Sequence, residues 1–234
     1  MPIGVVIFPG TNCDQDTFHV LKEVLEQDVR YVWHAETDLQ DLNAVVLPGG
    51  FAHGDYLRAG AIARFSPVMD AVRQMAEAGK PVLGICNGFQ VLLEAGLLPG
   101  AMRRNEGQRF VCQFVHVRVE NGDSPFLRAC LRGQVLRMPV AHGEGNYYAD
   151  PETLAGLNAS GRILLRYCTP DGTVDPVANP NGSVENIAGI CSAAGNVMGL
   201  MPHPERCSEM ILGSTDGRLL FESVVRSLTE RRPL

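Results

Sequence analysis

A cysteine lies where an apolar segment ends, with a glycine two residues away on each side: residues 84–88 read GICNG. This spacing fits the strand-to-helix turn that lifts a nucleophile above a sheet, where a larger residue would collide with the neighbouring strand and helix. The positive end of the following helix would favour the thiolate form of Cys86. Most single cysteines are small buried apolar residues, however, so the motif alone is a weak indication of a nucleophile.

A histidine and a glutamate near the C-terminus offer a base and its orienting carboxylate, in the segment MPHPE at residues 201–205. Prolines on both sides of His203 disfavour a helix, so we expect an extended chain in which His203 and Glu205 share one side, separated by Pro204 rather than touching. The imidazole would take the thiol proton, and the carboxylate would fix the ring tautomer. Without Cys86, a surface turn with a solvated histidine and glutamate would be the favoured interpretation of this segment. Together with Cys86 it predicts a cysteine–histidine–glutamate triad.

Such a nucleophile needs two backbone N–H groups that point at the developing oxyanion. One candidate is the N–H of Asn87, immediately after the cysteine, and the other is that of Gly50 in the segment LPGG. Gly49 and Gly50 are also compatible with a plain turn after a strand, which remains an alternative.

The elements that must position these residues alternate between short apolar strands and amphipathic helices. This alternation predicts an α/β fold with a mostly parallel central sheet that is covered by helices on both faces. Ligands bind beyond the carboxyl ends of such strands, so the glycines at 10, 49–50 and 84–88 should converge on one crevice. We expect strands at 3–8, 29–35, 43–50 and 81–85, with helices after residue 10, at 66–78, from 88 and at 216–230.

The chain after residue 108 has a different pattern. Its strands alternate between apolar and polar residues, which indicates antiparallel or mixed pairing in the C-terminal half. A segment rich in Pro, Gly, Asn and Asp, at 169–183, predicts a turn or a long hairpin connection, and a second hairpin should turn near Gly195. No linker is evident, so residues 1–234 are interpreted as one domain.

Composition excludes several classes of function. The 234 residues carry a formal net charge of −6 without a basic block, so neither nucleic acid nor a membrane is an expected partner. No signal peptide or membrane-length apolar run is evident. Seven cysteines, an odd number without CxxC pairs, argue against a disulfide framework and a structural zinc site. We therefore predict a cytoplasmic protein with no metal site.

Longer stretches narrow the function. The segments GICNGFQ and HPE resemble the class I, triad-type glutamine amidotransferases. Nearly the whole chain, in order, is similar to the glutaminase subunits of phosphoribosylformylglycinamidine synthase of the small multi-subunit type. The stretches that carry this resemblance are FPGTNCD at 8–14, GGFAHGDYLRAGAIA at 49–63, AHGEGNYYA at 141–149 and NPNGSVENIAGI at 179–190.

The resemblance implies a single-domain, flavodoxin-like amidotransferase fold and a specific reaction. Cys86 would attack the side-chain amide of L-glutamine and form a thioester, while His203 moves the protons and ammonia leaves. Partners would be a synthetase subunit, together with a small third subunit. ATP and magnesium would be used by the synthetase to convert formylglycinamide ribonucleotide to its amidine in purine synthesis, with no cofactor in this chain. The absence of a GxxxxGK[ST] loop agrees with that division.

Family positions also suggest substrate contacts. Gln90 matches a position that contacts glutamine, although a solvated helix residue is the default from sequence alone. The residues His142, Gly143 and Glu144 would lie near the glutamine α-carboxylate or the partner interface, or form a polar loop. The segment GDYLR at 54–58 would shape the site or cap a helix. Two other functions remain open: a stand-alone cysteine hydrolase or peptidase of the same fold, and a catalytically inert docking subunit.

Overall fold

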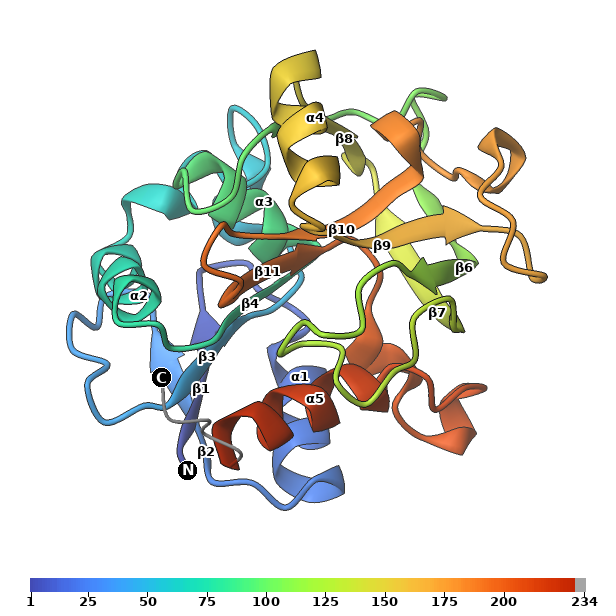
Figure 1. Ribbon diagram of the computed structural model, residues 1–234. Coiled ribbons are helices and arrows are strands. Elements are labelled where there is room, and N and C mark those ends of the chain that lie inside the picture. The colour runs from blue at the N-terminus through green and yellow to red at the C-terminus, as the bar shows by residue number, and fades with distance from the viewer. Residues whose placement is uncertain (230–234) are drawn as a thin grey trace.

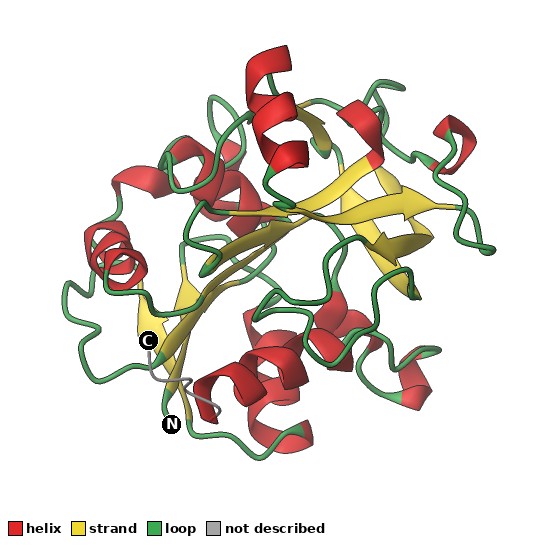
Figure 2. Cartoon of the chain, viewed as in Figure 1, coloured by secondary structure: helices red, strands yellow, loops and turns green. Residues whose placement is uncertain are grey.

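A long mixed sheet runs through the molecule and is flanked by helices (Figures 1 and 2). The computed structural model describes residues 1–229. Within them the sheet has nine strands, in the order β2-β1-β3-β4-β11-β10-β9-β6-β7, and β5 and β8 form a separate two-stranded sheet. The predicted α/β fold is confirmed. The single-domain interpretation of residues 1–234 stays a prediction, and residues 230–234 lie outside the described part.

The N-terminal half of the sheet is parallel, from β2 through β11. Its central strands are apolar along their whole length and almost fully buried, because helices cover both faces. The strands of this half are β1 (Ile3–Ile7), β2 (Val29–Trp33), β3 (Ala44–Leu47), β4 (Val82–Ile85) and β11 (Val197–Leu200).

The other half is antiparallel, as the alternating pattern after residue 108 predicts. In β7 every second residue is buried, which places one face on the core. The hairpin expected near Gly195 joins β10 to β11, and the segment 169–183 lies in the long connection from β9 to β10. The remaining strands are β5 (Ala101–Arg103), β6 (Val111–Val119), β7 (Val135–His142), β8 (Asn146–Tyr148), β9 (Ile163–Cys168) and β10 (Ile187–Cys191).

Helices cover both faces of the sheet: α2, α3 and α4 lie on one side, and α1 and α5 on the other (Figure 1). Each presents apolar residues to the core, as Leu220 and Val224 of α5 do. The α-helices are α1 (Asp14–His19), α2 (Val68–Glu77), α3 (Asn87–Glu94), α4 (Pro151–Ala159) and α5 (Arg218–Thr229).

Helix boundaries differ slightly from expectation. The first helix continues beyond α1 as π-helical turns over Val20–Val24. Helix α2 begins after Pro67, and the Ser66 side chain makes no capping bond to it. The predicted end of α5 at residue 230 lies outside the described residues. Short 3₁₀ turns occupy Ala52–Asp55, Ala63–Phe65, Pro176–Ala178, Val184–Asn186, Pro204–Cys207 (η6) and Met210–Leu212.

The carboxyl ends of β1, β3 and β4 meet at one edge of the sheet. Leu47 of β3 pairs with Gly84 of β4, so the turns that follow these strands are adjacent. Gly10, after β1, lies against the backbone of Phe51, after β3, and a β-carbon at position 10 would overlap with the Phe51 carbonyl oxygen. The glycine-marked turns therefore converge as the sequence predicts.

Candidate active site

Cys86 occupies the sharp turn between β4 and α3. Its backbone has φ +49° and ψ −104°, a strained conformation that residues with side chains rarely adopt. This conformation directs the thiol away from the strand ends. A β-carbon on Gly84 would lie 2.8 Å from the backbone of Gly88, and one on Gly88 would overlap with the carbonyl of Leu47. Both glycines of GICNG are thus needed for the close approach of helix and strands that the sequence suggests.

His203 and Glu205 are in direct contact, which corrects the predicted extended geometry. The chain turns into the 3₁₀ helix η6 at Pro204, and this turn folds the carboxylate back until Glu205 Oε1 lies 2.5 Å from His203 Nδ1. Proline restricts the residue before it but is itself well suited to the first turn of a helix, so the extended chain ends at His203. Both side chains are buried.

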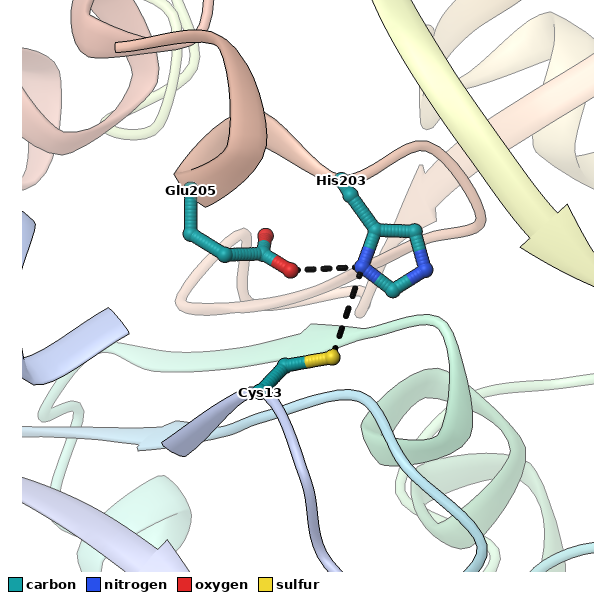
Figure 3. A group of neighbouring side chains, drawn as sticks. All are labelled: Cys13, His203 and Glu205. Carbon is teal, nitrogen blue, oxygen red and sulfur yellow. Dashed lines mark hydrogen bonds and ion pairs between the residues drawn. The ribbon is translucent and has the colours of Figure 1, made fainter. Parts of the chain in front are cut away.

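The surroundings of His203 favour its charged form. Burial opposes the imidazolium, but the Glu205 carboxylate, with smaller contributions from Cys86 and Cys13, raises the pKa of His203 well above its usual value. Nδ1 faces Glu205, while Nε2 points away from it (Figure 3). Nε2 is buried and accepts no hydrogen bond from residues 1–229. A ring held in this way can carry a proton at Nε2 while Nδ1–H donates a hydrogen bond to the carboxylate.

Two thiols therefore lie near the same imidazole, and their surroundings distinguish them. Cys86 is 5% exposed and lines a surface pocket, whereas Cys13 is 1% exposed and is not part of that pocket's lining. Cys13 Sγ lies 3.8 Å from Nδ1, the nitrogen already engaged by Glu205. Burial raises the pKa of Cys13. The accessible thiol of the pair is Cys86.

Most other cysteines are unsuited to act as nucleophiles. Burial raises the pKa of Cys130, Cys168 and Cys191 to about 11 and that of Cys207 to about 12, so these thiols stay protonated at neutral pH. They match the apolar interpretation that the sequence favours for isolated cysteines.

A pocket of roughly 270 Å³ opens beside Cys86. Its walls include residues that the sequence singles out and others that it does not. The residues expected from the sequence are Gly50, Asp55, Cys86, Gln90, His142, Gly143 and Glu144, and the unexpected ones include Phe51, Arg104, Gln108, Arg109 and Phe110.

A hydrogen-bond network fixes the pocket wall next to the nucleophile. Gln90 donates to the carbonyl of Glu144 at 2.6 Å and accepts from Asn87 Nδ2 at 2.9 Å. Asn87 also donates to Asp55 and accepts from the N–H of Ala52. The first turn of α3 is thereby tied to the loop after β3. Since Gln90 is buried and tied at both ends, it is not the solvated residue that sequence alone would suggest.

Asp55 has an unusual charge environment. Burial, reinforced by the nearby Glu144 carboxylate, raises the pKa of Asp55 to about 6, against an opposing hydrogen bond from Asn87. Two carboxylates therefore face the same pocket. This is a suitable environment for a bound cation or ammonium group.

The side chain of His142 supports the pocket wall. Nδ1 lies 3.1 Å from Asn105 Oδ1, and Nε2 lies 3.4 Å from Asn181 Nδ2. Burial lowers the pKa of His142 to about 4, so the ring is neutral at physiological pH. Both nitrogens are engaged by protein groups, and a contact of glutamine with His142, Gly143 or Glu144 stays a prediction.

The two expected oxyanion donors, the backbone N–H groups of Asn87 and Gly50, come from the two turns that follow β4 and β3. Asn87 is the first residue of α3, so its N–H has no acceptor within the helix. Gly50 lines the pocket with φ +151°, and a β-carbon there would lie 2.7 Å from Thr11 Cα. Their joint action on an oxyanion stays a prediction.

Arg104, Arg109 and Phe110 are functional candidates that sequence reasoning missed. They lie in the loop before β6, and pairing of β6 with β7 brings this loop to the pocket. The basic residues of RRNEGQRF at 103–110 were the only local signal, and nothing in that signal indicates which part of the fold the loop approaches.

Comparison with known proteins shows to which family this chain belongs. Residues 2–218 match the CobB/CobQ-like glutamine amidotransferase domain. The chain is 60% identical over 228 residues to phosphoribosylformylglycinamidine synthase subunit PurQ of Acaryochloris marina, covering 97% of each chain. It is also 60% identical to the subunit of that name from Moorella thermoacetica, over 96% of this chain and 95% of the relative.

The chain belongs to the PurQ family of glutamine amidotransferases. The resemblance inferred from GICNGFQ and HPE is thereby confirmed. The amidotransferase also matches a chain of the PurLQS structure from Thermotoga maritima, with a TM-score of 0.86, 41% identity and coverage of 97% and 98% of the two chains.

A solved structure with much lower sequence identity supports the fold assignment only. Another glutamine amidotransferase from Thermotoga maritima matches this chain with a TM-score of 0.56 at 16% identity, over 98% of this chain and 92% of that one. Within residues 1–229, every helix of the amidotransferase is too short or too polar to cross a bilayer.

Proposed function

We propose that this chain hydrolyses L-glutamine at Cys86 and delivers the ammonia to a synthetase subunit. The observation that carries the proposal is the placement of one accessible thiol, on a strained turn at the pocket wall, beside a buried histidine–glutamate pair. Family membership supports the same reaction.

The charged groups of the pocket suit the two ends of an amino acid. Arg109 offers a guanidinium group for the α-carboxylate, and Asp55 and Glu144 offer carboxylates for the α-ammonium. Arg104 Nε lies 3.8 Å from Glu144 Oε1 and forms an ion pair with that carboxylate. Because the Glu144 carboxylate would repel the α-carboxylate of glutamine, we assign Glu144 to the ammonium end. The family resemblance suggests instead an α-carboxylate contact, or a partner contact, for the HGEG segment. The side-chain amide would then reach Cys86.

The first half of the reaction makes the thioester. His203 Nε2 already carries the proton of the Cys86 thiol, in agreement with the raised pKa of His203, and the thiolate sulfur attacks the amide carbon. The N–H groups of Gly50 and Asn87 stabilise the oxygen as it becomes negative. The same proton then passes from Nε2 to the amide nitrogen, the carbon–nitrogen bond breaks and ammonia leaves. Glu205 holds Nδ1–H throughout and stabilises the imidazolium.

The second half regenerates the enzyme. Water gives a proton to Nε2 and attacks the thioester carbon, and the carbon–sulfur bond breaks to restore the thiolate beside the protonated ring. Glutamate is the product. No other side chain needs to change its protonation state during these reaction steps.

The partners belong to the proposal as well. The relative of known structure comes from an assembly named PurLQS, which joins the Q subunit with L and S subunits. A synthetase subunit of that kind would receive the ammonia and use ATP and magnesium to form the amidine of formylglycinamide ribonucleotide, and a small third subunit would complete the complex. This chain would hold no cofactor and would work in the cytoplasm.

The test is release of glutamate from glutamine by the full chain, alone and with candidate synthetase subunits. We expect weak activity alone, a large increase in the complex, and loss of both in Cys86→Ala. Cys112→Ala, at an exposed thiol on β6, is the matched control and should keep full activity. Undiminished hydrolysis by Cys86→Ala would refute the proposal.

A further inference from the structure

A second set of ligand-type atoms lies on the Nδ1 side of His203. Cys13 Sγ, His203 Nδ1 and a Glu205 carboxylate oxygen all lie within 4.8 Å of one another, and all three side chains are buried (Figure 3). Cys13 reaches this position from the turn after β1, 190 residues from His203 in sequence. The proposed reaction assigns no step to Cys13.

The three atoms are those that zinc prefers. Zinc binds thiolate sulfur, imidazole nitrogen and carboxylate oxygen at about 2.0–2.3 Å, which places neighbouring ligand atoms roughly 3–4 Å apart. Sγ lies 3.8 Å from Nδ1, which matches this spacing, whereas Nδ1 lies 2.5 Å from Oε1, so the carboxylate must withdraw for an ion to enter. Its other oxygen, Oε2, is buried and without a hydrogen-bond partner among residues 1–229. We propose that Cys13, His203 and Glu205 form an inhibitory Zn²⁺ site.

Gly49 packs closely against this cluster. A β-carbon at position 49 would lie 3.0 Å from Cys13 Sγ and 2.7 Å from His203 Cε1. Only a residue without a side chain lets the sulfur and the ring approach the backbone this closely, so position 49 helps to hold the two ligand groups together.

Arg206 lies against this cluster. Its Nη2 donates to Cys13 Sγ at 3.0 Å, and its Nε lies 4.0 Å from Glu205 Oε1 and 3.4 Å from Asp16 Oδ2. The guanidinium supplies positive charge where the ion would bind, so the two compete. The side chain is 37% exposed, which lets it move toward solvent when the ion enters.

Zinc at this position would prevent His203 from acting as a base without binding to Cys86. The Cys13 thiol releases its proton to solvent as the S–Zn bond forms. The ion takes the Nδ1 lone pair, so a proton on Nδ1 is released or moves to Nε2. The ring then keeps its one proton on Nε2, which has no lone pair left for the Cys86 proton. This inhibition depends on the proposed role of His203, whereas binding of the ion does not.

The test uses the full chain and Co²⁺ as a coloured probe, with Zn²⁺ as competitor. Wild type and Cys86→Ser should both show a thiolate-to-cobalt absorption band that zinc removes. Cys13→Ser should lose the band and bind zinc at least about 10-fold more weakly. Arg206→Gln should bind zinc about 10-fold more tightly, because a competing charge is gone. Cys112→Ser is the control for an exposed thiol and should match wild type.

Two results would overturn the site: loss of the band in Cys86→Ser, or zinc binding by Arg206→Gln that is no tighter than wild type. Neither depends on whether Cys13→Ser folds. Zinc should also stop glutamate release reversibly, with recovery after a chelator is added. If zinc binds through Cys13 but glutamine hydrolysis continues, the proposed inhibition is wrong and so is the role of His203 as base. The cobalt and zinc measurements on the variants would still show whether the metal site exists.

Discussion

The α-carbon of Gly88 lies directly against the carbonyl group of Leu47, so closely that a β-carbon at position 88 would overlap with the carbonyl oxygen. Through this contact the first turn of α3 rests on β3. The position of the thiol in the preceding turn therefore depends on backbone packing between a helix and two strands, rather than on its own side-chain contacts.

Replacing Gly88 with alanine should disturb this packing. Because the obstacle is backbone, helix and strand must separate, and we expect Gly88→Ala to lower the free energy of unfolding by about 3 kcal/mol. Urea denaturation measures the change. Gly107→Ala is the matched control, since a β-carbon there meets no atom within 4 Å. Equal stability of the two variants would contradict the packing described here.

Neutralising Glu205 should impair the base while preserving its shape. In Glu205→Gln the side chain can still accept a hydrogen bond from Nδ1, but it no longer stabilises the imidazolium. We expect kcat for glutamine hydrolysis in the complex to fall by about 10²- to 10⁴-fold. Glu209→Gln serves as control, because Glu209 pairs with the exposed His19. A decrease of less than threefold for Glu205→Gln would mean that the carboxylate has no such role.

Asp55 should make stability depend on pH. Its pKa rises from 3.8 unfolded to about 6 folded, so between these values the folded chain holds more protons than the unfolded one. Stability then falls as pH rises from about 4 to about 6 and stays lowered above that. Asp55→Asn removes the penalty and should be more stable than wild type at pH 7.5 by on the order of 1–2 kcal/mol, given the partial exposure of this carboxyl.

Urea denaturation of wild type and Asp55→Asn at pH 4 and pH 7.5 measures this effect. The difference between the two proteins should widen with pH. A constant difference would show that the carboxyl titrates normally in the folded chain.

Arg109 should contribute mainly to glutamine affinity. If its guanidinium holds the α-carboxylate, Arg109→Gln should raise KM for glutamine by about 10-fold and leave kcat nearly unchanged, since this contact is the same before and during the reaction. Steady-state kinetics in the complex give both constants. Arg132→Gln, at an exposed position outside the pocket, should match wild type. A lowered kcat with unchanged KM would remove Arg109 from the substrate contacts.

Local sequence was sufficient to predict the sharp turn at Cys86. The glycines at 84 and 88 could be interpreted because one physical requirement, close backbone approach, leaves glycine as the only suitable residue. The pairing of His203 with Glu205 was also correctly expected, but not its geometry, because Pro204 permits either an extended chain or the first turn of a helix.

The rest of the site depends on contacts between distant segments. Cys13 and Arg206 meet across 193 positions, and the loop that holds Arg104 and Arg109 reaches the pocket only through the pairing of β6 with β7. No local pattern encodes such proximity. The environment of Gln90 likewise depends on a distant segment, because the Glu144 carbonyl to which it donates lies 54 positions away.

The most direct test of the account is to identify the thiol that a glutamine-mimicking electrophile labels. The full chain, in complex with synthetase subunits, is incubated with an electrophilic glutamine analogue, and peptide mass spectrometry locates the adduct. We predict one adduct, on Cys86, and its loss when excess glutamine is present. An adduct on Cys13, the other thiol beside His203, with Cys86 unmodified would contradict the account.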